Sequence, residues 1–241
     1  MAEVELPDVP ENEKVMGFLD HLDELRTRLF RAVFYVGIAA LGVGVYWEQL
    51  FRLLLKPAGI KTVTYLGPLD AFMVKVKLAL YAGLVVAAPL IVYEILAFIL
   101  PALTRKEKRV TVPIVFFTVL LFYMGVVVGY FLILPPGTRW LLAQGGDVMV
   151  QMMTADRYLS FAMMFLAGVG ASFETPIVVY ILGKVGLVTP RSLLVNWRYA
   201  VLIIVTAAAL LTPDWSPVTM VLFAIPMVIL YFLSILLVKF F

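Results

Sequence analysis

Uncharged stretches long enough to cross a membrane alternate with short polar segments along this chain. Residues 110–138 carry no charged side chain and predict the clearest crossing, because about 20 apolar residues in a helix span the hydrocarbon core of a bilayer. The whole pattern predicts an all-α polytopic membrane protein with one membrane domain over residues 1–241. Its six transmembrane helices are expected at about 29–47, 72–100, 110–134, 158–183, 198–212 and 217–238.

Two segments precede the first crossing. Residues 1–17 contain five acidic residues and two prolines, a composition that predicts a flexible tail. Residues 18–28 are expected to form an amphipathic helix on the cytoplasmic side, because Leu22, Leu25 and Leu29 recur at helical spacing. The acids and arginines of the same segment then lie on the opposite face of that helix.

The fifth uncharged run, at 199–213, is only 15 residues long. A helix of that length covers about 22 Å, whereas the hydrocarbon core of a typical bilayer is about 30 Å thick. The sequence therefore predicts that the bilayer thins beside the fifth and sixth crossings.

The distribution of lysine and arginine indicates the orientation in the membrane. Six crossings place both termini on one side, and that side carries twelve of the 19 basic residues, against seven on the other. The segment 104–109 is the most strongly basic of the chain. Because cytoplasmic loops carry the excess of basic residues, both termini are expected in the cytoplasm.

Composition narrows the classes of function. The chain is 63% apolar and 15% charged with a mean hydropathy of +1.02, whereas soluble domains are about 45–50% apolar and about 25% charged. A net charge of +3 gives no indication of a nucleic-acid partner. The chain has no cysteine and one histidine, His21, so no disulfide, metal site or cofactor is expected. Since no histidine or cysteine lies in any crossing, the sequence also predicts that the protein is not an enzyme.

Several short motifs occur in a characteristic order. His21-Leu22-x-Glu24-Leu25-Arg26 precedes the first crossing, and Ala97-Phe98-Ile99-Leu100-Pro101-Ala102-Leu103 ends the second. Ser172-Phe173-Glu174-Thr175-Pro176 lies in the fourth crossing, and Leu211-Thr212-Pro213 and Ala224-Ile225-Pro226-Met227 surround the last hairpin. From about residue 18 to 238 the chain resembles the TatC family, the signal-peptide receptor subunit of the twin-arginine protein translocase.

The resemblance implies a fold, a function and a location. The fold would be a cupped, glove-like scaffold of tilted helices, several kinked at proline (Pro89, Pro176 and Pro226). The function would be to bind the twin-arginine signal peptides of folded proteins at the cytoplasmic face. The resemblance further implies assembly in multiple copies with single-span TatA- or TatB-type subunits, and export driven by the proton-motive force without nucleotide. The location would be the bacterial or archaeal cytoplasmic (inner) membrane.

Glu24 and Glu107 match the family positions for signal-peptide recognition. A carboxylate accepts the planar donor fork of a guanidinium through two hydrogen bonds, which a lysine cannot copy, and two arginines need two acceptors. The alternative for Glu24 is an i,i+4 ion pair with Arg28. The alternative for Glu107 is neutralisation of its own basic loop.

Three further residues complete the expected peptide site. Arg26 matches a family position and is expected to orient Glu24 or bind lipid phosphate; the alternative is an anchor that follows the positive-inside rule. Phe98 and Leu103 bracket the end of the second crossing and are candidates to pack against the hydrophobic part of a signal peptide. Alternatively, both are apolar residues at the membrane interface without a special role.

Two acidic residues lie within crossings. Glu174 is the more costly, because a carboxylate inside the bilayer costs on the order of 2.5–3.5 kcal/mol. The resemblance puts it on the cupped face, where it meets a partner helix or the translocating chain; the alternative is a hydrogen bond that holds a kink at Pro176. Glu94 is the second candidate for an intramembrane polar or partner contact; it is nearer the cytoplasmic end, where it is expected to reach water, and the sequence leaves its role open. The alternative function is a proton- or ion-coupled secondary transporter that uses Glu174.

The outer loops carry the last candidates. Pro57 matches a family proline and is expected to shape the first outer loop. The family aspartate before Ala-Ile-Pro falls on Ser216 in this chain, with Asp214 two residues earlier. Asp214 could take over that role through a shifted turn.

Overall fold

The computed structural model describes residues 18–60, 62–99, 108–146, 152–184, 186–212 and 216–240. These ranges are helical, and their only strand-like pairing is an isolated bridge between Thr64 and Thr154. Within them, five helical segments are long and apolar enough to cross a membrane, and a sixth, Trp197–Leu211, is apolar but shorter. The all-α class expected from the hydropathy pattern is confirmed.

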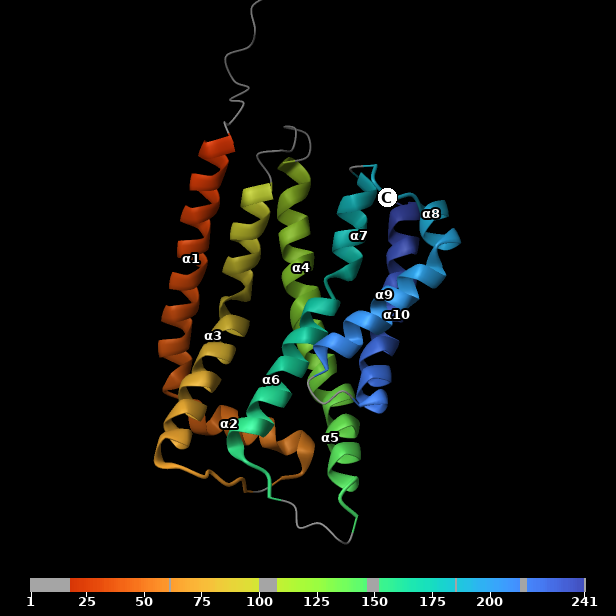
Figure 1. Cartoon of the computed structure of the whole chain (residues 1–241). Coiled ribbons are helices and arrows are strands. Elements are labelled where there is room, and N and C mark those ends of the chain that lie inside the picture. Colours follow the sequence, from red (N-terminus) through yellow and green to blue (C-terminus); the bar gives the residue numbers. More distant parts are fainter. Residues whose placement is uncertain are drawn as a thin grey trace, which may run out of the picture.

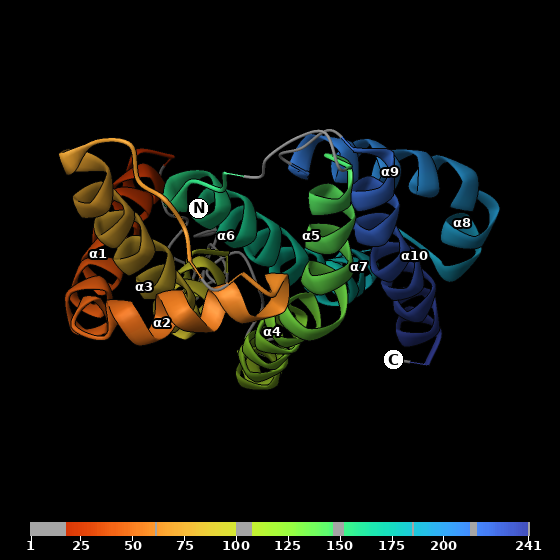
Figure 2. The same cartoon turned by 90° about the horizontal axis from the view of Figure 1, so that it is seen from below.

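The helices form two groups joined by a tilted one (Figure 1). The first group is α1 (Phe18–Gly44), α3 (Pro68–Ile99) and α4 (Lys108–Val128); the second is α7 (Thr175–Lys184), α8 (Pro190–Val195), α9 (Trp197–Leu211) and α10 (Pro217–Phe240). Helix α6 (Ala155–Ser172) runs obliquely between the groups, and the view from below shows the resulting elongated outline (Figure 2).

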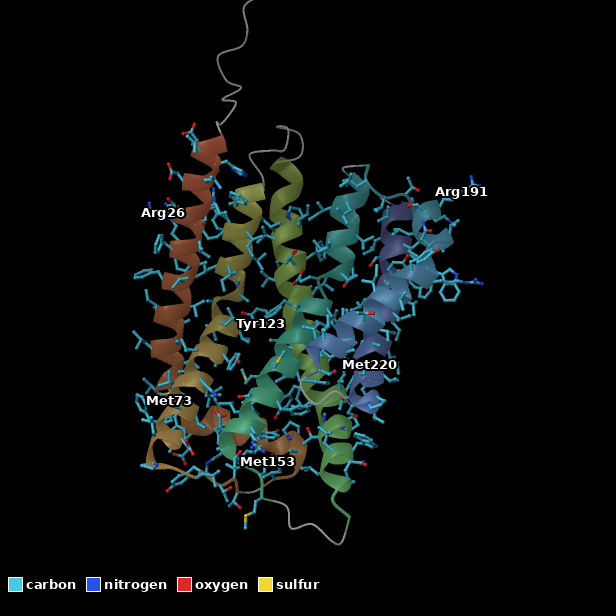
Figure 3. The ribbon with its side chains drawn as sticks, in the orientation of Figure 1. Arg26, Met73, Tyr123, Met153, Arg191 and Met220 are labelled. Carbon is cyan, nitrogen blue, oxygen red and sulfur yellow. The ribbon has the colours of Figure 1, made fainter. Side chains whose placement is uncertain are left out.

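Different helices form the two ends of the bundle (Figure 1). The start of α1, the end of α7 and the end of α10 lie together at what we call the inner end, and α2 (Trp47–Leu55) lies across the opposite, outer end (Figure 1). Arg26 and Arg191 are both near the inner end, whereas Met73 and Met153 are near the outer end (Figure 3).

Helices α1 and α3 pack closely through small residues. A Cβ atom at Gly83 of α3 would lie 2.7 Å from both the Cα and the backbone nitrogen of Ala40 on α1, so only glycine permits this approach. Close contact through small residues is a common way for membrane helices to associate. The remainder of α1 exposes a row of large apolar side chains, as expected of a helix that faces lipid. They are Leu29, Phe30, Val33, Phe34, Ile38 and Leu41.

The outer end is closed by α2 and the short turn η1 (Lys56–Ala58). Tyr158, at the start of α6, is almost fully buried, and its hydroxyl donates to the Leu54 carbonyl. The two outer loops are joined where the Thr64 backbone N–H donates to the Met153 carbonyl at 2.9 Å. Pro57 is buried within η1, between α2 and the rest of the first outer loop.

The third crossing does not end at its proline pair. The crossing predicted over 110–134 is longer in the structure, because α4 continues through a π-helical turn, η3 (Gly129–Ile133), into α5 (Leu134–Ala143). Pro135 and Pro136 fall in the first turn of α5. Proline is tolerated there, because the first N–H groups of a helix have no partner within it.

The fourth crossing consists of two helices with Phe173 and Glu174 between them. Pro176 has no N–H to offer the Ser172 carbonyl four residues earlier. The Thr175 hydroxyl donates to that carbonyl instead, at 2.7 Å. The Ser-Phe-Glu-Thr-Pro motif thus contains both the helix break and the group that satisfies the backbone freed by it, as a break at membrane depth requires.

The apolar helix α9 has only 15 residues, whereas α3 has 32. At about 1.5 Å per residue α9 spans roughly 22 Å, so we expect local thinning of the bilayer beside it. Spin labels at Tyr199 and Leu210 in lipid bilayers are expected to report both ends of α9 at headgroup depth. The same labels at the two ends of α3 serve as the control. A full-thickness hydrocarbon core beside α9 would contradict this prediction.

Candidate functional site

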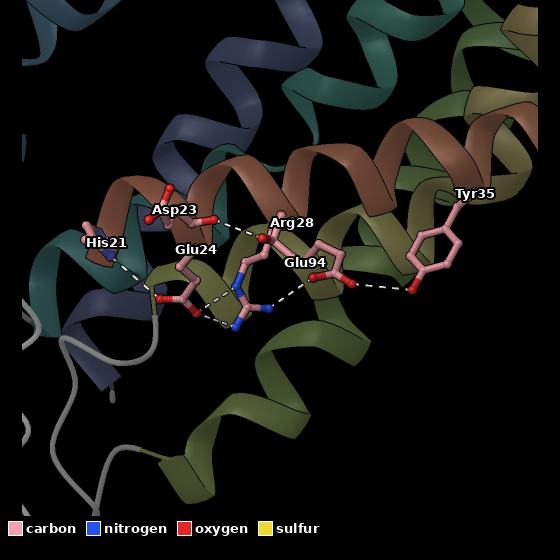
Figure 4. A network of polar contacts seen from close by, with 7 residues as sticks. His21, Asp23, Glu24, Arg28, Tyr35 and Glu94 are labelled. Carbon is pink, nitrogen blue, oxygen red and sulfur yellow. Dashed lines mark hydrogen bonds and ion pairs between the residues drawn. The ribbon is translucent and has the colours of Figure 1, made fainter. Parts of the chain in front are cut away.

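A group of polar side chains joins α1 to α3 near the inner end (Figure 4). Arg28 of α1 donates from Nε and Nη2 to Glu24 Oε1, at 2.9 and 2.6 Å, and from Nη1 to Glu94 Oε2 of α3, at 3.0 Å. The Tyr35 hydroxyl donates to Glu94 Oε1 at 3.4 Å. His21 Nδ1 lies 3.7 Å from Glu24 Oε2. We call these five residues the Arg28 cluster.

Helical periodicity brings four of these residues to one face of α1. His21, Glu24, Arg28 and Tyr35 follow one another at steps of three, four and seven residues, which are the steps that keep side chains on the same face. That face is turned towards α3, which supplies Glu94. The cluster is therefore built by the spacing on α1 together with the close packing of α1 and α3.

Glu94 is a buried member of this cluster, with only 3% of its surface exposed. The sequence-based expectation that Glu94 reaches water is wrong. Arg28 reaches across from α1 and provides the positive charge that a buried carboxylate needs. Sequence reasoning had paired Arg28 with Glu24 alone. The missed signal was that an acid within one crossing calls for a cation at similar depth in its neighbour.

The cluster has more acceptor capacity than its donors use. Two carboxylates share one guanidinium, so the net charge is −1 with His21 neutral. Glu24 Oε2 is buried and accepts no hydrogen bond from the described residues. His21 is within ion-pair distance of Oε2, but 3.7 Å is too long for a hydrogen bond. Within the described part of the chain, Glu24 therefore has one buried carboxylate oxygen without a hydrogen-bond donor.

Of the other predicted peptide-site residues, Phe98 contacts the Arg28 cluster, whereas Arg26 does not hold its carboxylate. Phe98 lies against the cluster, because its ring stacks on His21 with centroids 4.2 Å apart and planes 7° apart. Arg26 is exposed, and its guanidinium carbon lies 5.7 Å from the centre of the Phe30 ring. Among the described residues Arg28, rather than Arg26, holds the Glu24 carboxylate. Glu107 and Leu103 lie outside the described residues.

A second candidate site is a groove of about 860 Å³ along the side of the bundle. Its walls come from α2, α3, α4, α6 and α7 with smaller parts of α1 and η3, and they are almost entirely apolar. Among the described residues that line it, Glu174 is the only charged one. Glu174 Oε1 and Thr118 Oγ1 are buried and have no hydrogen-bond partner within the described part of the chain.

The groove suits an apolar partner better than a moving ion. Buried polar atoms normally have hydrogen-bond partners, so the two unpartnered atoms favour an occupant that brings polar groups of its own. A proton or ion relay would need further charged residues at matching depth. The described lining of the groove supplies none besides Glu174.

The last outer turn is described only in part. Asp214 lies outside the described residues. Ser216 is buried just before α10, where its hydroxyl oxygen accepts the Val218 N–H at 3.3 Å and its carbonyl accepts the Thr219 hydroxyl at 3.1 Å. Ser216 thus stabilises the start of α10 as a helix cap.

These features define a class of protein: a multi-spanning helical membrane protein with a charged cluster at one end and an apolar groove in its side. The family model described as "Sec-independent protein translocase protein (TatC)" matches residues 20–226. The chain belongs to this TatC family.

Relatives and solved structures agree with this assignment. The chain is 35% identical over 227 residues to the TatC protein of Synechocystis sp., covering 94% of this chain and 89% of the relative. For the TatC protein of Helicobacter pylori the identity is 37% over 219 residues, covering 91% and 87%. A crystal structure of the twin-arginine translocase receptor TatC superposes with a TM-score of 0.78 at 33% identity, covering 91% of this chain and 98% of that one.

Chloroplast relatives are longer. The chain is 38% identical over 228 residues to the chloroplastic TATC protein of Oryza sativa, and the match covers 94% of this chain but 62% of the relative. For the Arabidopsis thaliana relative the identity is also 38%, and the match covers 66% of its length. The chain therefore spans somewhat less than two thirds of these plant proteins.

Proposed function

We propose that this protein is the core receptor and scaffold of a twin-arginine translocase, and that it binds twin-arginine signal peptides of folded proteins at the cytoplasmic face. The observation that carries the proposal is the buried Oε2 of Glu24, which accepts no hydrogen bond from the described residues, within a cluster of net charge −1. A second guanidinium would neutralise that charge and fill that acceptor. The family membership and the likeness to a solved twin-arginine translocase receptor support the same function.

Each residue of the peptide site has a distinct task in this proposal. Glu24 accepts one arginine of the signal peptide and Glu107 accepts the other. Phe98, stacked beside the cluster, packs with Leu103 against the apolar part of the peptide. Arg26, exposed on α1, binds lipid phosphate beside the site. Arginine is preferred over lysine because only a guanidinium presents two parallel N–H donors to a carboxylate.

The groove and the ends of the bundle support the rest of the proposal. The inner end, where Arg26 and Arg191 lie (Figure 3), faces the cytoplasm of a bacterium or archaeon in this proposal, and the positive-inside rule assigns both termini to the same side. The groove receives the apolar helix of a single-span subunit of TatA or TatB type, with Glu174 as its polar contact. Several copies assemble, and the proton-motive force drives export without a nucleotide or a cofactor.

The test is binding of a twin-arginine signal peptide to the purified full chain in lipid nanodiscs, measured beside a twin-lysine version of the same peptide. Charge-assisted hydrogen bonds contribute about 1.5–3 kcal/mol, so Glu24→Gln and Glu107→Gln are each expected to weaken binding of the arginine peptide at least about tenfold. The preference for arginine over lysine is expected to shrink in both variants.

A matched control is available at the outer end. Glu48 forms the same i,i+4 pair with Arg52 on α2 that Glu24 forms with Arg28, and it is exposed. Glu48→Gln changes the net charge equally and is expected to leave peptide binding unchanged. Equal binding of the arginine and lysine peptides to the unsubstituted protein would contradict the proposed function.

A further inference from the structure

The Arg28 side chain already occupies one oxygen, Oε1, of the carboxylate that the proposed function assigns to a signal peptide. Its Nε and Nη2 atoms lie 2.9 and 2.6 Å from Glu24 Oε1, so two N–H groups of the guanidinium converge on a single carboxylate oxygen. The peptide-free protein thus holds its own arginine at the recognition carboxylate. An incoming guanidinium must share Glu24 with Arg28 or replace it there.

Arg28 also has a second partner at the same time. Its Nη1 donates to Glu94 Oε2 at 3.0 Å, and Glu94 sits on a different helix, where the Tyr35 hydroxyl contacts its other oxygen. Glu94 is buried and is placed too deep to receive a surface ligand directly. Because Glu94 also binds Arg28, Arg28 can leave Glu24 and still keep one anionic partner.

We propose that Arg28 is an internal stand-in for a signal-peptide arginine, and that Glu94 retains Arg28 when a peptide guanidinium takes its place on Glu24. Glu94 is then a positioning residue, which controls access to Glu24 without touching the peptide. The inference rests on the proposed function, because it describes how the same carboxylate exchanges one guanidinium for another.

Charge balance favours this exchange. Before binding, Glu24 and Glu94 share one cation and carry a net charge of −1 with His21 neutral. After binding, each carboxylate has a guanidinium of its own and the cluster is neutral. Without Glu94, the displaced Arg28 would be left without an anion in a partly buried site, which is strongly unfavourable. Because Glu94 keeps Arg28 paired, a peptide guanidinium can replace Arg28 on Glu24 without leaving a buried charge unpaired.

The test is a cycle of peptide affinities on the full chain in nanodiscs, using the twin-arginine peptide as probe. Glu94→Gln is expected to weaken binding about tenfold, because Arg28 then has only Glu24. Arg28→Gln is expected to tighten binding several-fold, because the internal competitor is gone. In the double variant Glu94→Gln/Arg28→Gln the affinity is expected to return to at least that of the unsubstituted protein.

Two additions keep the result clear. Arg28→Lys retains a cation for Glu94 but removes the paired N–H contacts to Glu24 Oε1. It is therefore expected to tighten peptide binding, and it tests the inference even if Arg28→Gln fails to fold. Glu48→Gln and Arg52→Gln make the same charge changes in the matching pair on α2. Both variants are expected to bind the twin-arginine peptide with the affinity of the unsubstituted protein.

The outcomes separate the inference from the proposed function. If Glu94→Gln binds like the unsubstituted protein, or weakens binding equally with and without Arg28, Glu94 only fastens α3 to α1 and the inference fails while the receptor function stands. If the unsubstituted protein shows no preference for the arginine peptide, the proposed function fails and the inference fails with it.

Discussion

Gly83→Val is expected to lower the melting temperature of the purified protein by on the order of 10 °C, or to prevent its accumulation in the membrane. A Cβ at this position would lie 2.7 Å from the backbone of Ala40, and backbone cannot move aside as the end of a side chain can. Helices α1 and α3 would have to separate, and the Arg28–Glu94 contact depends on their distance. Thermal unfolding in detergent or nanodiscs measures the loss.

Gly42→Val is the matched control for this change. Gly42 lies on α1 in the same helix pair, but a Cβ there would have no atom within 4 Å. The intrinsic effect of valine in place of glycine in a helix is the same at both positions, so the difference in melting temperature isolates the close packing. Equal melting temperatures for the two variants would show that the approach at Gly83 is not needed.

Glu174→Leu is expected to raise the stability of the protein and to abolish export. The Glu174 carboxyl group ends in an apolar groove, where its buried Oε1 has no hydrogen-bond partner among the described residues. An unsatisfied buried polar group costs about 1–3 kcal/mol. Leucine removes that cost. It also removes the polar contact proposed for a partner helix, so a folded reporter with a twin-arginine signal should no longer leave the cytoplasm of cells that rely on this chain.

Thr118→Val tests the same groove without touching the carboxyl group. Thr118 Oγ1 is the other unpartnered polar atom of the groove lining, and valine has nearly the same shape. We expect a gain in stability with export largely kept. If Glu174→Leu exports the reporter normally, Glu174 has no role in partner contact and only contributes to the break between α6 and α7.

The sequence predicted the helices better than their ends. Uncharged runs identify segments that must be helical in lipid, so the all-α class follows from composition and pattern alone. The pattern predicts that the third crossing ends at residue 134, directly before Pro135 and Pro136. Proline ends one helix or begins the next according to its position, and only the structure shows this pair in the first turn of α5. The Ser-Phe-Glu-Thr-Pro motif suggested a kink, whereas Thr175 lets the chain break fully into two helices.

The candidate site was predictable only where contacts are local. The i,i+4 spacing of Glu24 and Arg28 is written in the sequence, and the structure shows that ion pair. The link from Arg28 to Glu94 joins residues 66 positions apart, and it depends on how α1 and α3 are set against each other. The burial of Glu94 follows from the same packing. No single-helix pattern contains that information.

The Arg28–Glu94 pair has a consequence for the synthesis of the chain. One residue lies in α1 and the other in α3, so both partners are present once these two helices have left the ribosome and entered the bilayer. The first two crossings then enter the bilayer as a hairpin that carries the neutralising cation for its own buried acid. The chain thus makes the helices that contain this ion pair first, and the later helices pack against them.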